Sequence, residues 1–572
     1  MPTDVVGSAL RAYWAIYRDR DELEQQIFIQ ERVLCDLRSR LNKLTPIARL
    51  PPDILAEVFL VRVAQCAATA PDAADADLSW LRLLLVCTHW RHIAISTPAL
   101  WTRVVVGARA QWLQLQLLRA HEMPLTVLAV FTQGARPEEE DAKVLNLECI
   151  IQNELARVRI LHLRAPVQIV RQAFMAIAIA HSAAHLTEFK IEYVPQEASI
   201  GDDRPILPFL LPDNMPTLQK LVLVEIPFMW MSLPSFVNLR HLEIRKDVRD
   251  GHLVMADFLN AVESLNLLEF LSLRFNISCY AQGTVLAMWQ VPHTRVIILP
   301  YLRNLMLQAS CADCSVLLNH MVFSRSPNIS CVCLTDRGSE DFAAAIAAKL
   351  IYELVPLNTI SLQSGLITRL LVFQGDAPLP QLPSNPIRAL SGSAQLDLSL
   401  CMEGMPNSHM LWMALICRAL PLAYLRRLEI SSPQGCFGEV EWWLKVFGTM
   451  DEVTTLRICG PSCGVLPQML RVPVHGRDDQ PFMLPRLERL EVDLPPVPRE
   501  LVNATIGRYA SDLRASLTDR RALGMGLGQL AVLQRASSQV ESDQHVFMQL
   551  LQPVVPTIFE TDNSGALISV ST

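Results

Sequence analysis

Two pairs of closely spaced cysteines are the residues of this sequence best suited to chemistry. They are Cys311-x-x-Cys314 and Cys331-x-Cys333, and cysteine thiolates are common zinc ligands. In the strand register expected here, Cys331 and Cys333 would share the outward face of a sheet. A C-x-C pair is not the usual second half of a zinc site, and cysteine is also common in apolar cores. We therefore predict no bound metal, with zinc as the alternative.

Other patterns of reactive residues do not match known catalytic motifs. His181-x-x-x-His185 lacks the glutamate of a metalloprotease helix. The glycines of Gly524-x-Gly526-x-Gly528 follow a helix, so they predict a turn instead of a dinucleotide site. The acidic run 138–141 predicts a solvated loop. With no P-loop and no nucleophile–base set, we predict no catalytic residue and no cofactor.

Composition narrows the class of protein. Of 572 residues, 51% are hydrophobic and 19% are charged, and the net charge is -7. A nucleic-acid-binding surface needs an excess of Lys and Arg, so no nucleic-acid partner is expected. The 14 cysteines are scattered through apolar runs, as in reduced intracellular proteins. We find neither a signal peptide nor an apolar stretch of membrane-spanning length, so cytoplasm or nucleus is the expected location.

The first 46 residues predict one long helix with a heptad seam. Positions 23, 27, 30, 34, 37, 41 and 44 are Leu, Ile, Gln, Leu, Leu, Leu and Leu, and steps of four and three are typical of a coiled coil. Thr45-Pro46 ends the helix. Two interpretations stay open: a coiled coil that makes a homodimer, or a single helix packed on its neighbouring domain.

Residues 50–59, LPPDILAEVF, predict a short helix that begins at a proline. Ile54, Leu55, Val58 and Phe59 are expected to share one face. An Ala- and Asp-rich linker, 67–77, precedes a second helix that contains Val86, Cys87 and Trp90. Pro98-Ala99-Leu100-Trp101 begins a third short helix with Thr97 as its cap.

The ordered series LPxDIL, VF, VCxxW and PALW resembles the F-box motif, in the F-box-like form abundant in mushroom-forming fungi. The resemblance covers about 55 residues strongly. It implies a three-helix unit that binds a Skp-type adaptor and, through it, a cullin. The residues it implies for the adaptor face or its support are Leu50, Pro51, Ile54, Leu55, Val58, Phe59, Val86, Trp90, Leu100 and Trp101.

A pattern L-x-x-L-x-L recurs through the rest of the chain and predicts leucine-rich repeats. It occurs at 158–163, 186–191, 218–223, 239–244, 268–273, 302–307, 329–334, 357–362, 425–430, 453–458 and 487–492. Up to residue 357 the starts are 21 to 34 residues apart. The period is lost from 365 to 415, where a proline-rich loop lies at 377–386, and Leu396-x-Leu398 is a weak further match.

Residues between the repeated leucines are expected to line an outward, mildly basic surface for a protein target. The candidates are His241, Arg245, Arg274, Arg427, Arg457 and Arg489. A helix is expected at 510–521 and a terminal cap at 545–554, and residues after Glu560 are expected to be loosely ordered.

The predicted fold class is α + α/β. The expected order is an amphipathic heptad helix (1–46), an F-box-like three-helix domain (47–104), a connecting segment (105–150), an irregular leucine-rich-repeat solenoid with a parallel sheet (151–535) and a cap and tail (536–572). The resemblance implies a non-catalytic substrate-recognition subunit of a Skp–cullin–F-box ubiquitin ligase. The alternative is a repeat scaffold that is dimerised by the N-terminal helix and has no ligase role.

Overall fold

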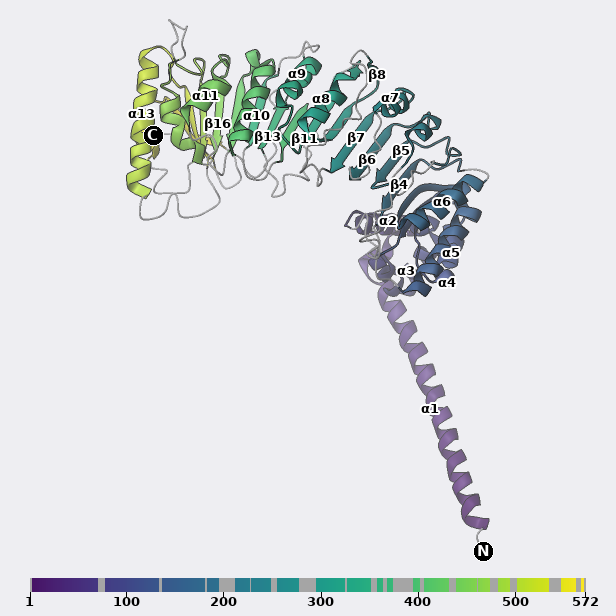
Figure 1. Ribbon diagram of the computed structural model, residues 1–572. Coiled ribbons are helices and arrows are strands. Elements are labelled where there is room, and N and C mark those ends of the chain that lie inside the picture. Colours follow the sequence, from purple (N-terminus) through teal and green to yellow (C-terminus); the bar gives the residue numbers. More distant parts are fainter. Residues whose placement is uncertain are drawn as a thin grey trace. The chain divides into compact units, whose positions relative to one another are not determined.

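The computed structural model describes residues 3–69, 78–132, 136–180, 183–194, 211–226, 228–247, 255–276, 295–324, 327–350, 357–363, 368–373, 395–401, 406–431, 439–459, 461–473, 482–493, 502–533, 547–561 and 567–569. The chain mixes helices and strands and contains a large, mostly parallel sheet, which confirms the coarse fold class (Figure 1). It divides into two compact units. The first is Met1–Arg204 with Pro212–Leu218, and the second is Pro205–Leu211 with Gln219–Thr572. The boundary falls inside the segment predicted as one repeat region.

The first unit begins with helices and continues into four parallel strands. Its helices are α1 (Thr3–Lys43), α2 (Pro52–Thr69), α3 (Thr88–Ser96), α4 (Ala110–Ala120), α5 (Pro137–Glu154) and α6 (Val167–Ile179). Its 3-10 helices are η1 (Pro46–Arg49), η2 (Leu78–Leu85), η3 (Pro98–Trp101) and η4 (Leu155–Arg157). Strands β1 (Arg103–Val105), β2 (Leu125–Val130), β3 (Val158–Ala165) and β4 (Glu188–Tyr193) pair in that order.

Local rules account for most helix ends in this unit. Helix α1 ends before Pro46, as predicted, and α2 begins at Pro52 with Asp53 in its first turn. The acidic run 138–141 is the first turn of α5, so the predicted loop was wrong. Pro137 opens that helix, and the glutamates stabilise it because they lie at the positive end of its dipole.

The predicted second helix is two elements. The 3-10 helix η2 ends at Leu85, and α3 starts at Thr88, where the sulfur of Cys87 accepts a hydrogen bond from the Trp90 amide. The third helix, η3, has Thr97 at its cap position, but the Thr97 hydroxyl donates to the Ile93 carbonyl instead of capping. Helix α2 continues to Thr69 and takes in the first residues of the predicted linker, whose remainder, 70–77, lies outside the described residues.

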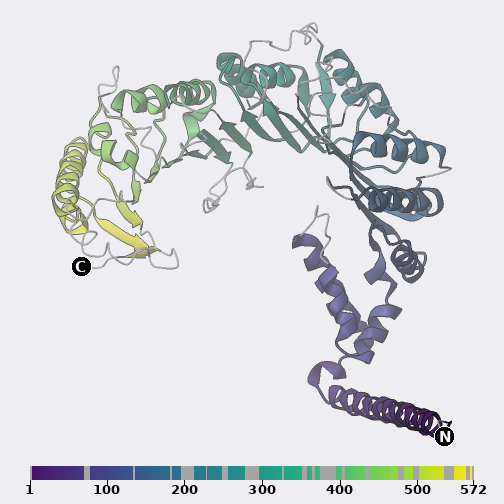
Figure 2. The same ribbon diagram turned by 60° about the horizontal axis from the view of Figure 1, so that its bottom comes forward.

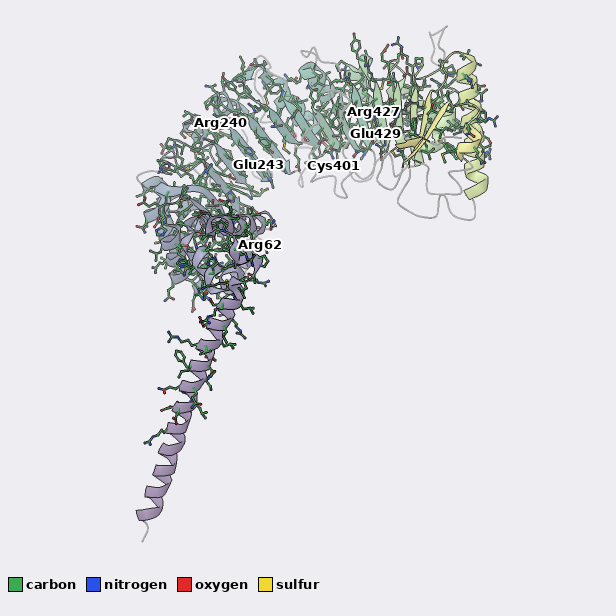
Figure 3. All side chains as sticks on the ribbon, turned by 180° about the vertical axis from the view of Figure 1, so that it is seen from behind. Arg62, Arg240, Glu243, Cys401, Arg427 and Glu429 are labelled. Carbon is green, nitrogen blue, oxygen red and sulfur yellow. The ribbon has the colours of Figure 1, made fainter. Side chains whose placement is uncertain are left out.

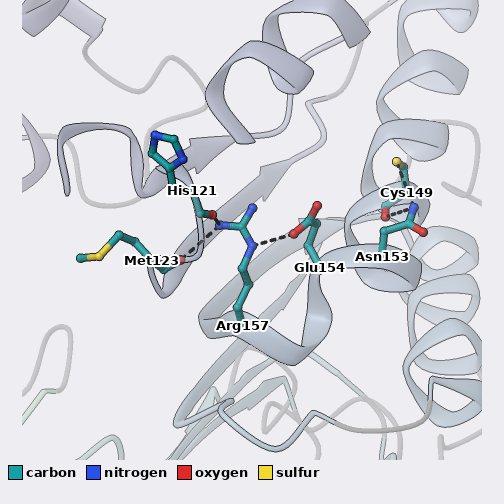
Figure 4. A network of polar contacts seen from close by, with 6 residues as sticks. All are labelled: His121, Met123, Cys149, Asn153, Glu154 and Arg157. Carbon is teal, nitrogen blue, oxygen red and sulfur yellow. Dashed lines mark hydrogen bonds and ion pairs between the residues drawn. The ribbon is translucent and has the colours of Figure 1, made fainter. Parts of the chain in front are cut away.

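Arg157 joins three elements of the first unit (Figure 4). Its guanidinium donates to the carbonyls of His121 and Met123, in the turn between α4 and β2, and pairs with Glu154 at 2.6 Å. His121 ends α4 with φ of 48°, a conformation that exposes its carbonyl to this cation. Strand β2 lies within the segment 105–150, which was predicted only as a connection, and β1 ends at the first residue of that segment.

The second unit is a long sheet with helices on one face (Figures 1 and 2). Its strands are β5 (Lys220–Val224), β6 (His241–Asp247), β7 (Phe270–Asn276), β8 (Ile297–Leu299), β9 (Asn304–Ala309), β10 (Met321–Phe323), β11 (Asn328–Cys333), β12 (Thr359–Gln363), β13 (Thr368–Phe373), β14 (Leu396–Leu400), β15 (Arg427–Ser431), β16 (Thr455–Cys459), β17 (Arg489–Asp493), β18 (Gln529–Leu533), β19 (Thr557–Thr561) and β20 (Leu567–Ser569).

Helices and 3-10 helices alternate with these strands. They are η6 (Trp230–Ser235), α7 (Met255–Glu263), α8 (Cys311–Asn319), α9 (Ser339–Leu350), α10 (Pro406–Ala419), η9 (Leu422–Tyr424), α11 (Val440–Phe447), η10 (Pro461–Val465), α12 (Leu466–Met469) and α13 (Val502–Ala522). Each of the eleven L-x-x-L-x-L segments overlaps a strand of the described residues. Helix α13 confirms and extends the one predicted at 510–521. After Glu560, where loosely ordered residues were expected, Thr561 ends strand β19 and Leu567–Ser569 form β20, so the prediction was wrong for these residues; 562–566 and 570–572 lie outside the described residues.

Strands β8 and β10 pair with each other in a separate two-stranded sheet, and among the remaining strands of the second unit the pairing departs from chain order at one place. The order is β5-β6-β7-β9-β11-β14-β13-β12-β15-β16-β17-β18-β19-β20. Strand β13 is antiparallel to both of its neighbours, β12 and β14. This inversion coincides with the stretch where the leucine period is lost; the proline-rich loop at 377–386 lies outside the described residues.

Candidate protein-interaction surfaces

The helices that follow α1 enclose a small aromatic core. Phe59 of α2 packs on Trp90 of α3 with ring centroids 5.0 Å apart, and Trp80 meets Trp101 edge-on at 5.2 Å. The Trp101 indole donates to the Ala94 carbonyl at 2.8 Å, and the Arg119 guanidinium lies 4.3 Å above the Trp101 ring. Burial of these large rings fixes the positions of α2, η2, α3 and η3 relative to one another.

Four of the ten predicted adaptor residues belong to this core. Leu55, Phe59, Leu100 and Trp101 have at most 1% of their surface exposed, so they support a surface and cannot contact another protein. The expectation that Ile54, Leu55, Val58 and Phe59 share one face of α2 was therefore wrong. Successive helical residues are about 100° apart, so Leu55 and Phe59 point inward while Ile54 and Val58 point outward.

Helix α2 consequently carries a second, outward apolar stripe. We call it the α2 strip: Leu50, just before the helix, with Ile54, Val58 and Val61. These side chains are 37% to 57% exposed. Pro51 is exposed beside them and Trp90 is half-buried. Val61 was not predicted, although its spacing of seven from Ile54 places it on the same stripe.

Two further exposed apolar side chains lie at the end of η2 and directly after it. Val86, which was predicted, and Leu85, which was not, are 54% and 80% exposed. Arg62 donates to the Ser79 hydroxyl at 3.2 Å, and the Cys66 sulfur lies 3.4 Å from the same oxygen. These contacts join α2 to η2 (Figure 3 labels Arg62). The run Leu83-Leu84-Leu85 has no helical period that would have identified Leu85 as exposed.

The six predicted target-binding residues lie on the sheet face of the second unit, in two groups. His241, Arg245 and Arg274 surround Glu243, which Figure 3 labels. Arg245 pairs with Glu243 at 2.8 Å and Arg274 approaches it to 3.8 Å, while the His241 ring stacks on Phe270 at 4.0 Å. Burial alone would raise the pKa of Glu243, but the neighbouring His241 ring, the hydrogen bond from Arg245 and the charges of the two arginines lower it to about 2.

Arg427, Arg457 and Arg489 form the second group with two buried glutamates. Arg427 and Arg489 reach Glu491 at 3.3 and 2.9 Å, and Arg457 reaches Glu429 at 3.8 Å. Figure 3 labels Arg427 and Glu429, both on β15. Burial raises the pKa of Glu429 against the lowering effect of Arg457 and Arg427. Glu429 Oε2, Arg427 Nε and Arg457 Nε are buried and have no hydrogen-bond partner among the described residues.

Six strand steps separate β7 from β15, so at about 4.8 Å a step the two groups are about 29 Å apart along the sheet. Between them Arg369 on β13 holds Asp397 on β14 through two buried hydrogen bonds of 2.8 and 2.6 Å. The predicted basic surface is thus two separate sets of arginines, the first around the half-buried Glu243 and the second around the buried Glu429 and Glu491.

The four cysteines considered at the outset lie in the core of the second unit. Cys331 and Cys333 face inward with Cys311 and Cys314 and are fully buried, so the predicted outward orientation was wrong. Cys331 pairs with Leu307 of β9, an inward residue. Hydrogen bonds from Cys331 and Cys333 lower the pKa of Cys314 to about 5. Within the described residues, no group of three or more Cys, His, Asp or Glu is arranged to hold a metal ion.

The remaining sequence patterns have simple placements. Gly524 has φ of 78° and lies in a turn after α13, as predicted. His185 is exposed and His181 lies outside the described residues.

Among the helices that the structure describes, none combines the length and the apolar character needed to span a membrane. No protein-family model and no curated protein matches this chain.

Proposed function

We propose that this chain is a non-catalytic substrate-recognition subunit of a Skp–cullin–F-box type ubiquitin ligase. Residues 47–104 would be the F-box-like domain and would bind the adaptor. The leucine-patterned strands of residues 151–535 would form a repeat solenoid that binds a protein target. The observation that carries the proposal is the α2 strip, an exposed apolar stripe on a helix whose inward residues Leu55 and Phe59 are buried.

The α2 strip is suited to contact with another protein. Apolar side chains on a folded surface gain about 25 cal/mol for each Å² of apolar area that a partner removes from water. A contiguous apolar stripe bordered by charged residues, here Asp53, Glu57 and Arg62, is typical of a protein interface. The aromatic core beneath keeps the stripe in one conformation, which lowers the entropic cost of binding.

The sheet face supports the proposed binding of a protein target. Stacked repeats present extended surfaces on which a target contacts several strands at once. The arginines around Glu243 and Glu491 are held in place by ion pairs, so they offer guanidinium groups in fixed positions to acidic or polar side chains of a target.

The proposed mechanism is proximity. A chain that holds the adaptor on one surface and the target on another raises the effective concentration of the target near the enzyme that transfers ubiquitin. Such a subunit needs no catalytic group of its own.

Aspartate substitutions in the α2 strip test the adaptor role. Ile54→Asp with Val58→Asp places two charges on the exposed stripe and leaves the inward residues Leu55 and Phe59 unchanged. We expect affinity purification of the native chain to recover a Skp-type adaptor and a cullin, and the double variant to lose both.

Leu118→Asp is the matched control, since Leu118 is an exposed leucine on α4, 71% accessible. It should retain both proteins, and circular dichroism should show that all three chains are equally folded. Recovery of the adaptor by the double variant, or its absence from the native sample, would contradict the proposal.

The second candidate function is a scaffold that is dimerised by α1 and has no ligase role. The exposed heptad seam of α1 favours it. The two candidates differ in one outcome: a scaffold retains its partners when Ile54 and Val58 carry the aspartate substitutions.

A further inference from the structure

Helix α1 exposes its whole heptad seam. The six apolar seam residues are Leu23, Ile27, Leu34, Leu37, Leu41 and Leu44, and all are 46% to 70% exposed. Gln30, the seventh seam residue, is exposed as well. The seam therefore does not pack on the described part of its own chain, which removes support from the interpretation that α1 is a single helix docked on a neighbouring domain.

An uncovered seam of this length requires a partner helix. Burial of a leucine or isoleucine side chain contributes about 1.5–3 kcal/mol, so leaving six such side chains exposed along one helix is unfavourable. Helices with apolar residues at spacings of three and four bury them by supercoiling with another helix that has the same repeat. A globular partner would not match a 3.5-residue period over three heptads.

The seam is complementary to itself. If two copies align in parallel and in register, each of the seven seam residues meets its own equivalent, and every apolar layer is leucine on leucine or isoleucine on isoleucine. Gln30 then faces Gln30 of the second copy, and two side-chain amides satisfy each other's donors and acceptors.

Gln30 also determines whether the two helices run parallel or antiparallel. An antiparallel pair could place Glu31 beside Arg38 of the second copy, and an exposed ion pair of that kind contributes about 0.2–1 kcal/mol. It would set Gln30 against a leucine, and a buried amide without a partner costs about 1–3 kcal/mol. The parallel arrangement is therefore favoured.

Charged residues outside the seam stabilise the helix within one chain. Arg20 pairs with Glu24 at 2.8 Å and Arg40 with Asp36 at 3.0 Å, both four residues apart. These pairs stabilise the helical conformation of α1 within one chain.

We propose that α1 forms a parallel, in-register two-stranded coiled coil with α1 of a second copy of this chain. The dimer carries two sheet faces and two α2 strips. A target with two binding segments is then held by both sheets, and the second contact forms at a raised effective concentration. This inference does not depend on the adaptor role.

Sedimentation of the purified full chain tests the dimer. The native chain should have the mass of two chains, and Leu34→Asp with Leu41→Asp should reduce it to one, because two charges would then lie on the seam. Phe28→Asp with Ile29→Asp is the matched control, since both residues are exposed apolar side chains of α1 that lie off the seam. The control should keep the dimer mass.

A native mass of one chain would overturn the proposal, and so would a seam variant that keeps the dimer mass. If the α1 seam instead bound an unrelated protein, the purified native chain would sediment with the mass of one chain.

Cysteine cross-linking tests the orientation. Cys35 and Cys149 are exposed, so both test chains carry Cys35→Ser and Cys149→Ser. Gln30→Cys should give a covalent dimer on mild oxidation, because equivalent seam positions face each other in a parallel register. Arg32→Cys, on the outer face of the helix, should give none. Cross-linking through position 32 but not position 30 would refute the parallel arrangement.

Discussion

Gln116, on α4, has its whole side chain sealed from solvent, and its amide nitrogen and oxygen have no hydrogen-bond partner among the described residues. We expect Gln116→Met, which keeps nearly the same volume, to raise the free energy of unfolding by about 1–3 kcal/mol because it removes an unsatisfied buried amide. Thermal unfolding measures the change. Gln114→Met, at an exposed position of the same helix, should change stability by less than about 0.5 kcal/mol; equal effects of the two substitutions would refute the argument.

Through Glu243, the folding stability of the chain depends on pH in the acid range. Its pKa in the folded chain is lowered from 4.5 to about 2, so the unfolded chain binds the proton more tightly than the folded chain does. The stabilisation by Glu243 is therefore complete above pH 4.5 and is lost as the pH falls toward 2.

We expect Glu243→Gln to lower stability at about pH 6 and to lose less of it between about pH 6 and pH 3 than the native chain. Urea unfolding midpoints at the two pH values measure both effects. An identical acid response of the two chains would show that the arginines around Glu243 do not stabilise its charge.

At the scale of the element, the buried and the exposed apolar residues of α2 are adjacent in sequence: Leu55 and Phe59 are buried, whereas Ile54 and Val58 are exposed. Phe59→Ala should cost about 3–5 kcal/mol because it opens a cavity beside Trp90 and Leu55. Val58→Ala should cost less than about 1 kcal/mol, because Val58 already contacts water. Differential scanning calorimetry of the two variants compares them, and similar losses would mean that the outward stripe is buried in solution.

Element ends were predictable where a proline or an adjacent cap decides them, as at Pro46, Pro52 and Pro98. The division of the second helix was not, because the run 78–86 is apolar at nearly every position and has no period. The packing of Trp80 on Trp101 and the cap at Cys87 determine where η2 ends and α3 begins, and both depend on contacts between separate segments.

At the scale of the whole chain, the strands were the most predictable feature, because each leucine pattern acts locally through period-two burial. Their register was less certain. Ile329 was assigned to the first leucine position of its repeat, whereas its pairing with Leu305 places it at the second. That shift moved Cys331 and Cys333 to the wrong face, since one residue reverses the face of a strand.

The inversion of β12, β13 and β14 could not be predicted from the same pattern. Strands β12 and β14 both alternate apolar and polar residues, and such a local alternation does not specify which strands pair, so the local sequence permits several orders. The order is determined by the antiparallel pairing of β13 with both neighbours and by the buried Arg369–Asp397 pair that joins β13 to β14. For the candidate surfaces, the sequence could not separate the exposed side chains, such as Ile54 and Val58, from the buried ones, such as Leu55 and Phe59.

The apolar character of α2 on two sides has a consequence for how this segment can change. A one-residue insertion near Pro52 would rotate the following residues by about 100° and bring Ile54, Val58 and Val61 toward the positions now held by Leu55 and Phe59. The interior would still be filled with hydrocarbon, so such a mutant could fold, yet it would display a different outward chemistry. An insertion here would therefore change the exposed side chains of α2 while its buried side stays apolar.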